Sequence, residues 1–189
     1  MVTDMIIRGG RIHLRQITEK DCTDQYVSWL TDPEVIQYLE TRWNEQTMKS
    51  IVEFVKSQRE NDYSILFAIV LNSDNRHIGN MKIGPWNKHH NHADISYFIG
   101  DKTCWNKGMA TEAIHLVCKF GFSEWNLHRV EAGAYSAAVG SWKALERNGF
   151  IREAVFREQV VSNGNYMDIY RYGLLRDEFK KNYLEGVTK

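Results

Sequence analysis

The sequence lacks any apolar run long enough to form a signal-peptide core or to cross a membrane. Its first ten residues hold only the short apolar run Met5–Ile7, whereas a membrane-spanning helix needs about 20 such residues. We therefore expect no membrane partner and a cytoplasmic location.

An excess of charge of one sign is also missing. The chain has 24 Lys and Arg residues against 24 Asp and Glu residues, so its formal net charge is zero. Proteins that hold nucleic acid non-specifically carry a basic field or a clustered basic stripe. The composition therefore argues against a nucleic-acid partner.

Cysteine is scarce, and its spacing fits neither a disulfide framework nor a metal site. Cys22, Cys104 and Cys118 are odd in number and widely separated, so we expect free thiols in a reducing compartment. The stretch His89–His92 contains three histidines but lacks a helical His-x-x-x-His pair. We therefore expect no metal.

Two familiar nucleotide-binding loops are absent. A P-loop needs Lys followed by Ser or Thr after its last glycine, but Met109 follows Gly108. The three-glycine fingerprint G-x-G-x-x-G does not occur anywhere in the chain. ATP-type and dinucleotide-type phosphate loops are thereby excluded.

What the chain does contain is typical of a compact α/β protein. With 43% hydrophobic and 25% charged residues over 189 positions, we expect a single domain spanning residues 1–189, without repeats or linkers. Strands are expected at Arg11–Ile17, Tyr63–Leu71, Arg76–Ile83, Ile95–Gly100 and His128–Tyr135, with a hairpin about Ser162–Asn165. Helices are expected from Thr18, from Asp32, from Thr47, at Met109–Phe122, at Ser141–Phe150 and near Arg176–Tyr183. This order predicts an α/β (α+β) fold with a mixed, largely antiparallel sheet and helices on both faces.

The most informative segment is the loop Cys104–Ala113, which joins an expected strand to an expected helix. The first turn of a helix has N–H groups without an internal partner, and the helix dipole favours negative charge there. Gly108 and Ala110 are small enough to let a phosphate approach this backbone. The segment therefore predicts a cradle for a phosphorylated ligand.

Other segments agree with this interpretation. Downstream lie the strand His128–Tyr135 and the helix Ser141–Phe150, which an Asn-Gly pair ends. In this order and spacing, the chain resembles the GNAT superfamily of acyl-CoA-dependent N-acyltransferases. Within it, the chain looks like the branch of ribosomal-protein N-terminal acetyltransferases (the RimJ/RimL type). The resemblance extends from Ile12–Arg15 through Trp29–Val35 to Tyr166–Tyr170 and covers nearly the whole chain.

The resemblance implies acetyl-CoA as a cosubstrate. The family's pyrophosphate motif, Gln/Arg-x-x-Gly-x-Gly/Ala, falls on Trp105–Ala110, where Trp105 and Asn106 depart from the usual residues. Because the motif binds mainly through backbone N–H groups, we expect these departures to change loop packing and stiffness without abolishing binding. The implied cofactor-binding residues are Phe98, Ile99, Gly100, Trp105, Asn106, Lys107, Gly108, Met109, Ala110, Thr111 and Ser141.

The implied reaction needs a base for the attacking amine. An α-amino group has a pKa near ~8 and needs little help, whereas an alkylammonium near ~10.4 needs a base. Asp94 is the expected base, acting through water, and His92, His90 and His89 are further candidates at the same end of the strand.

The departing CoA thiolate needs a proton. Ser141 matches a polar position that lies near the cofactor sulfur in this branch, so it is the expected donor. Its alternative role is to cap the helix. Tyr97 is the second candidate. Leu145 stands where many members have Tyr, and Ala138 where an Asn is usual.

The acceptor end is less specific. The segment Tyr38–Asn44 lies where the family builds its acceptor pocket, and the expected acceptor-binding residues are Tyr38, Arg42, Trp43 and Tyr135. The favoured acceptor, by resemblance, is a protein N-terminal α-amine, with an amino sugar or nucleotide-linked amino sugar as the alternative. A non-catalytic acyl-CoA-binding module, which is a function of a different class, also stays open because Trp105, Ala138 and Leu145 depart from the residues usual in the family. Both a monomer and a homodimer are compatible with the sequence.

Overall fold

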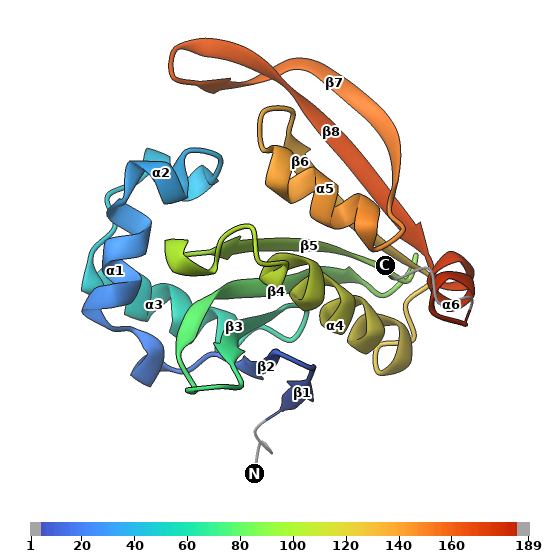
Figure 1. Cartoon of the computed structure of the whole chain (residues 1–189), viewed down its shortest axis with the longest axis horizontal. Helices are drawn as coiled ribbons and strands as arrows, with labels where there is room; N and C mark the ends of the chain where they lie inside the picture. The colour runs from blue at the N-terminus through green and yellow to red at the C-terminus, as the bar shows by residue number, and fades with distance from the viewer. Residues whose placement is uncertain (1–4, 185–189) are drawn as a thin grey trace.

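One mixed sheet of eight strands forms the centre of the protein in the computed structural model, which describes residues 5–184 (Figure 1). The strand order is β1-β2-β3-β4-β5-β6-β8-β7, and every neighbouring pair is antiparallel except β5 and β6. The strands are β1 (Ile6–Arg8), β2 (Ile12–Gln16), β3 (Ile65–Leu71), β4 (His77–Asn87), β5 (His92–Ile99), β6 (Arg129–Tyr135), β7 (Ile151–Ser162) and β8 (Asn165–Leu175). The predicted mixed, largely antiparallel sheet is confirmed.

Helices begin where the sequence supplies capping side chains. Asp32 accepts from the backbone of Glu34 at 2.9 Å, and Thr47 accepts from that of Ser50 at 3.1 Å. The helices are α1 (Asp24–Thr31), α2 (Pro33–Ile36), α3 (Met48–Arg59), α4 (Met109–Ser123), α5 (Val139–Arg147) and α6 (Arg176–Leu184), with short 3-10 turns η1 (Glu19–Asp21), η2 (Glu40–Trp43) and η3 (Lys102–Cys104). Among residues 5–184, no helix combines the length and the apolar character needed to span a bilayer.

Helices cover both faces of the sheet, as predicted. Along β3, Phe67 and Ile69 point into the core cluster that α4 completes, whereas Leu66 and Ala68 point into the cluster built with α1 and α3. Successive side chains of a strand alternate between faces, so an unbroken apolar strand serves two cores at once. Figure 1 shows α1 and α3 on one side of the sheet and α4 on the other.

The start of the first helix differs from the prediction. Thr18 and Asp21 form a capping box, but it closes only the 3-10 turn η1, and α1 begins later, capped by Thr23. The carboxylate of Asp21 binds Arg15 of β2, whose Nη1 donates to Oδ2 at 2.8 Å and whose Nη2 donates to Oδ1 at 2.5 Å. The chain therefore turns once before α1 starts.

Two strand features were not predicted. The strand β1 precedes the first expected strand, and β5 begins at His92 rather than at Ile95. The hairpin about Ser162–Asn165 joins strands of 12 and 11 residues, and it extends beyond the rest of the sheet in Figure 1.

The parallel pair β5–β6 is joined over only part of its length. Its register runs from His92 opposite Arg129 to Ile95 opposite Ala132 and then stops. Both strands continue, β5 to Ile99 and β6 to Tyr135. The two strands therefore diverge beyond Ile95, and the edge of β5 that faces β6 is left without a partner strand.

Candidate functional site

A cavity of about 1880 Å³ opens where β5 and β6 diverge. Its walls include the free ends of both strands, the loop before α4 with that helix's first turn, and one side of α5. The segment from α2 through η2 closes another side. The cavity therefore touches nearly every segment from which the sequence predicted a function.

The loop before α4 has the conformation of an anion cradle. Gly108 is the N-cap of α4 in the left-handed region, with φ +76°, and no side chain caps the helix there. The N–H groups of the first turn are thus free of internal acceptors and lie beside the cavity, which Met109 and Ala110 line. Asn106 also has a positive φ, +57°, a conformation that asparagine tolerates.

Arg11, which lies next to β2, binds the carbonyls of this loop. This contact was not predicted from the sequence. Arg11 Nη1 donates to the carbonyl of Lys107 at 2.6 Å, and Nη2 donates to that of Gly108 at 3.3 Å. Its Nε donates to Glu112 at 2.8 Å. The loop carbonyls are therefore bound on the β2 side. A sequence separation of 96 and more residues gives no local signal for these contacts.

Trp105, which stands where the family has Gln or Arg, anchors the loop to the end of β5. Its indole N–H donates to the carbonyl of Ile99 at 2.8 Å, and its ring packs against the core cluster of α1 and α3. Gly100 lies under Trp29, where a Cβ would come within 2.1 Å of the indole. Gly100 and Lys107 do not line the cavity, whereas the other predicted cofactor residues do.

The structure brings Tyr97 and Ser141 together. The Tyr97 hydroxyl lies 3.0 Å from Ser141 Oγ and 3.1 Å from its carbonyl oxygen. Burial raises the pKa of Tyr97, so its hydroxyl keeps its proton at neutral pH. Ser141 Oγ bonds to Tyr97 rather than to a helix N–H, and Ala138, the N-cap of α5, makes no side-chain cap bond. Both hydroxyl-bearing residues line the cavity.

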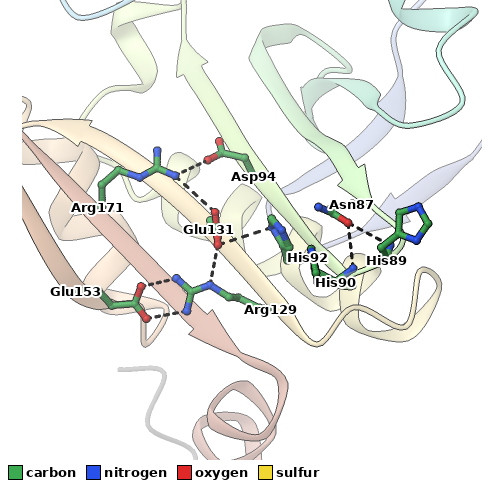
Figure 2. Close-up of polar contacts among 9 residues, drawn as sticks. All are labelled: Asn87, His89, His90, His92, Asp94, Arg129, Glu131, Glu153 and Arg171. Carbon is green, nitrogen blue, oxygen red and sulfur yellow. Dashed lines mark hydrogen bonds and ion pairs between the residues drawn. The ribbon is translucent and has the colours of Figure 1, made fainter.

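Asp94 sits within a network of charges (Figure 2). Arg171 Nη2 lies 3.3 Å from Asp94 and 3.6 Å from Glu131, and His92 Nδ1 lies 3.7 Å from Glu131. Burial raises the pKa of Asp94, against the opposing effect of Arg171. Asp94 does not itself line the cavity, but Ser96, two positions further on the same face of β5, does.

Of the other candidate bases, His92 belongs to this network through Glu131 but does not line the cavity, whereas His89 and His90 lie outside the network. His89 and His90 are exposed in the turn between β4 and β5, and their backbone N–H groups donate to Asn87 Oδ1 at 3.1 and 3.0 Å (Figure 2). Neither residue lines the cavity. The structure thus brings Asp94 close to the cavity and leaves these two histidines outside it.

The predicted acceptor residues form a second polar group. Tyr135 donates to Glu40 Oε1 at 2.5 Å and accepts from Arg42 Nη2 at 2.7 Å, and its ring lies 5.7 Å from that of Tyr38. Tyr38, Tyr135 and Glu40 line the cavity, whereas Arg42 and Trp43 stack on each other outside it. Glu40 belongs to the expected acceptor segment Tyr38–Asn44 but was not singled out within it, because an isolated glutamate carries no recognisable motif.

Two cationic side chains on α5 also belong to the site, although they were not predicted from the sequence. Lys143 and Arg147 are one helical turn apart, exposed, and line the same cavity as the α4 loop. Asn148 Nδ2 donates to the carbonyl of Thr111 at 3.0 Å, which fixes the end of α5 against the first turn of α4. The site therefore has positive side chains beside its backbone cradle.

Comparisons with known proteins agree with this geometry. Residues 11–151 match the family model described as an acetyltransferase (GNAT) domain. The N-acetyltransferase p20 of Bacillus licheniformis is 26% identical over 171 residues, which cover 89% of this chain and 95% of the relative.

Solved structures share the fold. The chain is similar to RimL, a ribosomal L7/L12 alpha-N-protein acetyltransferase in complex with coenzyme A, with a TM-score of 0.81 and 16% identity over 92% of this chain and 99% of that one. It is also similar to a spermidine N-acetyltransferase from Vibrio cholerae in complex with CoA and spermine, with a TM-score of 0.80 and 18% identity over 91% and 99% of the two chains.

Proposed function

Because this chain belongs to the GNAT acetyltransferase family, we propose that it transfers the acetyl group of acetyl-CoA to a protein N-terminal α-amine. The family membership makes the protein an N-acetyltransferase, and the relatives are named accordingly. That naming argues against a non-catalytic acyl-CoA-binding module. The choice of cosubstrate and acceptor is the proposal.

The divergence of β5 and β6 is the observation that carries the proposed cosubstrate, whereas the proposed acceptor is supported by the similarity to RimL. Beyond Ile95, the edge of β5 facing β6 has no partner strand, and an arm with amide groups can bond to such an edge as another strand would. The N–H groups at Gly108–Ala110 fit a pyrophosphate at one end of the same cavity. The residues present therefore fit acetyl-CoA, whose thioester would supply the acetyl group.

The attacking amine must be neutral. Asp94 is the proposed base, acting through water near Ser96, and its pairing with Arg171 favours the ionised form that a base requires. An α-amino group with a pKa near ~8 is already partly neutral at pH 7, so a base reached through water suffices.

The Tyr97–Ser141 pair is the proposed source of the proton for the leaving thiolate. If Tyr97 donates to Ser141 Oγ, the serine hydroxyl is free to donate into the cavity, and the raised pKa of Tyr97 keeps that tyrosine protonated in this role. Ser141 gives its proton to the thiolate and regains one from water, so Tyr97 stays neutral. The direct attack of the amine needs no covalent enzyme intermediate.

An acceptor panel tests the proposal. Purified protein is incubated with acetyl-CoA and peptides with free N-termini, polyamines, aminoglycosides or nucleotide-linked amino sugars, and the products are identified by mass spectrometry. We expect acetylation of the peptides at the α-amine. Acetylation confined to the sugars would replace the proposed acceptor with the alternative one.

A further inference from the structure

Lys82 is an unpaired cation inside the cavity. It lies on β4, is half-buried, and lines the cavity beside its cross-strand neighbour Ser96. Among the described residues, no carboxylate lies within ion-pairing distance of its ammonium. Withdrawing a charge from water without a partner is costly, so a half-buried lysine in a cavity is suited to meeting an anion there.

Arg171 brings a second cation to the same place. It stands opposite Gly133 in the β6–β8 register, and a Cβ at Gly133 would come within 2.9 Å of its Nη1. Because Gly133 lacks that atom, the guanidinium crosses β6 and reaches Asp94 on β5. Within residues 5–184, the hydrogen bond and ion pairs of Arg171 use Nη2. The Arg171 side chain also lines the cavity.

The two cations flank the point where the strands diverge. Lys82 faces Ser96 across β4 and β5, and Ser96 follows the last residue, Ile95, that pairs with β6. Asp94 and Glu131 share the charge of Arg171. These two carboxylates outnumber the guanidinium, and Lys82, which also helps to lower the pKa of Asp94 at longer range, balances the second negative charge. The Lys82 ammonium is nevertheless without a direct ion-pair partner among the described residues.

The cavity's carboxylates lie elsewhere. Among the described residues, the carboxylate side chains that line the cavity are exposed and belong to one segment. They are Glu34, Glu40 and Glu45. Glu34 is 3.0 Å from Lys102, and Glu40 is hydrogen-bonded by Tyr135. The carboxylates that line the cavity thus belong to the exposed segment, whereas Lys82 and Arg171 line it from the half-buried sheet face. The exposed Lys143 and Arg147 add positive charge from α5.

We propose that Lys82 and Arg171 form an anion subsite that selects acceptors carrying a carboxylate within a few bonds of the reactive amine. For the proposed function, on which this inference rests, the acceptor is a protein N-terminus with Asp or Glu as its first or second residue. Complementary charge across a binding site favours such a partner and penalises a like-charged one. Polyamines, which carry several positive charges, are poor acceptors on this account.

Matched peptides test the inference. Sets of peptides identical except for Glu, Gln or Lys at the first or second position are compared by kcat/KM. At one of the two positions we expect a preference of about tenfold or more for Glu over Gln, with Lys lowest, because tenfold corresponds to one modest charge interaction.

Variants of Lys82 link that preference to the site. In Lys82→Gln we expect the Glu and Gln peptides to become nearly equal, and in Lys82→Glu we expect the order to favour the Lys peptide. The KM for acetyl-CoA stays unchanged in both. Lys119→Glu, which changes the same charge at an exposed position of α4, is the control and keeps the wild-type preference.

The outcomes separate the two proposals. Acetylation of all peptides at equal rates would overturn the anion subsite and leave the proposed function standing. No acetylation of any peptide, with transfer to spermine or to a nucleotide-linked amino sugar, would overturn the proposed function itself. A peptide preference for Glu that survives in Lys82→Gln would also overturn the assignment of the subsite.

Discussion

The hydroxyls of Tyr97 and Ser141, which lie 3.0 Å apart, act as one proton-donating unit on our account. Tyr97→Phe and Ser141→Ala should each lower kcat about 10²-fold, at the lower end for a positioned acid, while the KM for acetyl-CoA changes little. The double variant should be no slower than the worse single variant, because either substitution already breaks the unit. Steady-state kinetics of the three variants measure this.

Ser123→Ala, at an exposed position at the end of α4, serves as the control and should behave as wild type. Strictly multiplicative losses in the double variant would show that the two hydroxyls act independently. An unchanged kcat in Ser141→Ala would remove that residue from the chemistry.

Asp94 gives a pH signature. A base must be ionised, and burial raises the pKa of Asp94, so wild-type kcat/KM should fall as the pH drops through that raised pKa. Asp94→Asn should lose about 10²-fold at pH 6. The loss should shrink toward pH ~8, where an α-amine is increasingly neutral without help. A loss that is constant from pH 6 to 9 would contradict a role as base.

Prediction from sequence succeeds unevenly at the residue scale. Ser141 could be named from a matching family position, Asp94 from its place at the start of a strand, and Tyr97 as a second hydroxyl; their catalytic roles stay predictions. The contact between Tyr97 and Ser141 could not be predicted, since 44 residues separate them. Arg11 and Lys82 were missed because their significance lies in what surrounds them in space, and neither stands in a local pattern.

The loop before α4 depends on the turn before β2. We expect Arg11→Ala to raise the KM for acetyl-CoA about tenfold, equivalent to ~1.4 kcal/mol, while kcat at saturation stays near wild type. The reason is that the carbonyls of Lys107 and Gly108 lose their donors, so the N–H cradle is less well ordered. Steady-state kinetics at varied acetyl-CoA concentration measure KM and kcat separately.

Arg8→Ala, at an exposed position of β1, is the matched control. Glu112→Gln should reproduce part of the effect, since Glu112 accepts from Arg11. Equal losses in kcat and in kcat/KM for Arg11→Ala, with an unchanged KM, would contradict a positioning role.

The ion pair at the turn η1 should contribute to the free energy of unfolding in a pH-dependent way. Although burial alone raises the pKa of Asp21, its bonds with Arg15 and Thr18 outweigh burial and lower it. A lowered pKa in the folded state stabilises the protein above the unfolded pKa of ~3.9, and this stabilisation is lost as the pH falls through the folded value. Asp21→Asn should therefore cost about 1–3 kcal/mol at pH 7.

Urea unfolding of wild type and Asp21→Asn at pH 7 and in acid measures that cost. The difference between the two proteins should narrow as the pH falls from ~3.9 through the lowered pKa of folded Asp21, because the carboxyl is protonated first in the unfolded chain and then in the folded protein. A difference that does not vary with pH would contradict the ion pair as its source.

Element starts were predicted where capping is local. Asp32 and Thr47 lie next to the helices that they cap, so the sequence contains the whole signal. Strand ends were predicted less well, because a strand extends as far as its neighbours pair with it. The lengths of β7 and β8 and the early start of β5 are set by such partners.

At the scale of the whole molecule, the order of strands and helices predicted the sheet and its covering on both faces. The parallel β5–β6 pair follows from the helix α4 that joins them. The partial separation of that pair has no signature in either strand. It creates the cavity that unites the α4 loop, the Tyr97–Ser141 pair and the acceptor residues.

The most direct test of the central claim is acetylation of one peptide with a free N-terminus, measured against the same peptide with a blocked α-amine. Release of free CoA from acetyl-CoA is followed by a thiol reagent, and the product is mapped by fragmentation mass spectrometry. The account predicts CoA release with the free peptide alone and the acetyl group on its α-nitrogen. Equal release with both peptides, or an acetyl group on a lysine side chain, would contradict it.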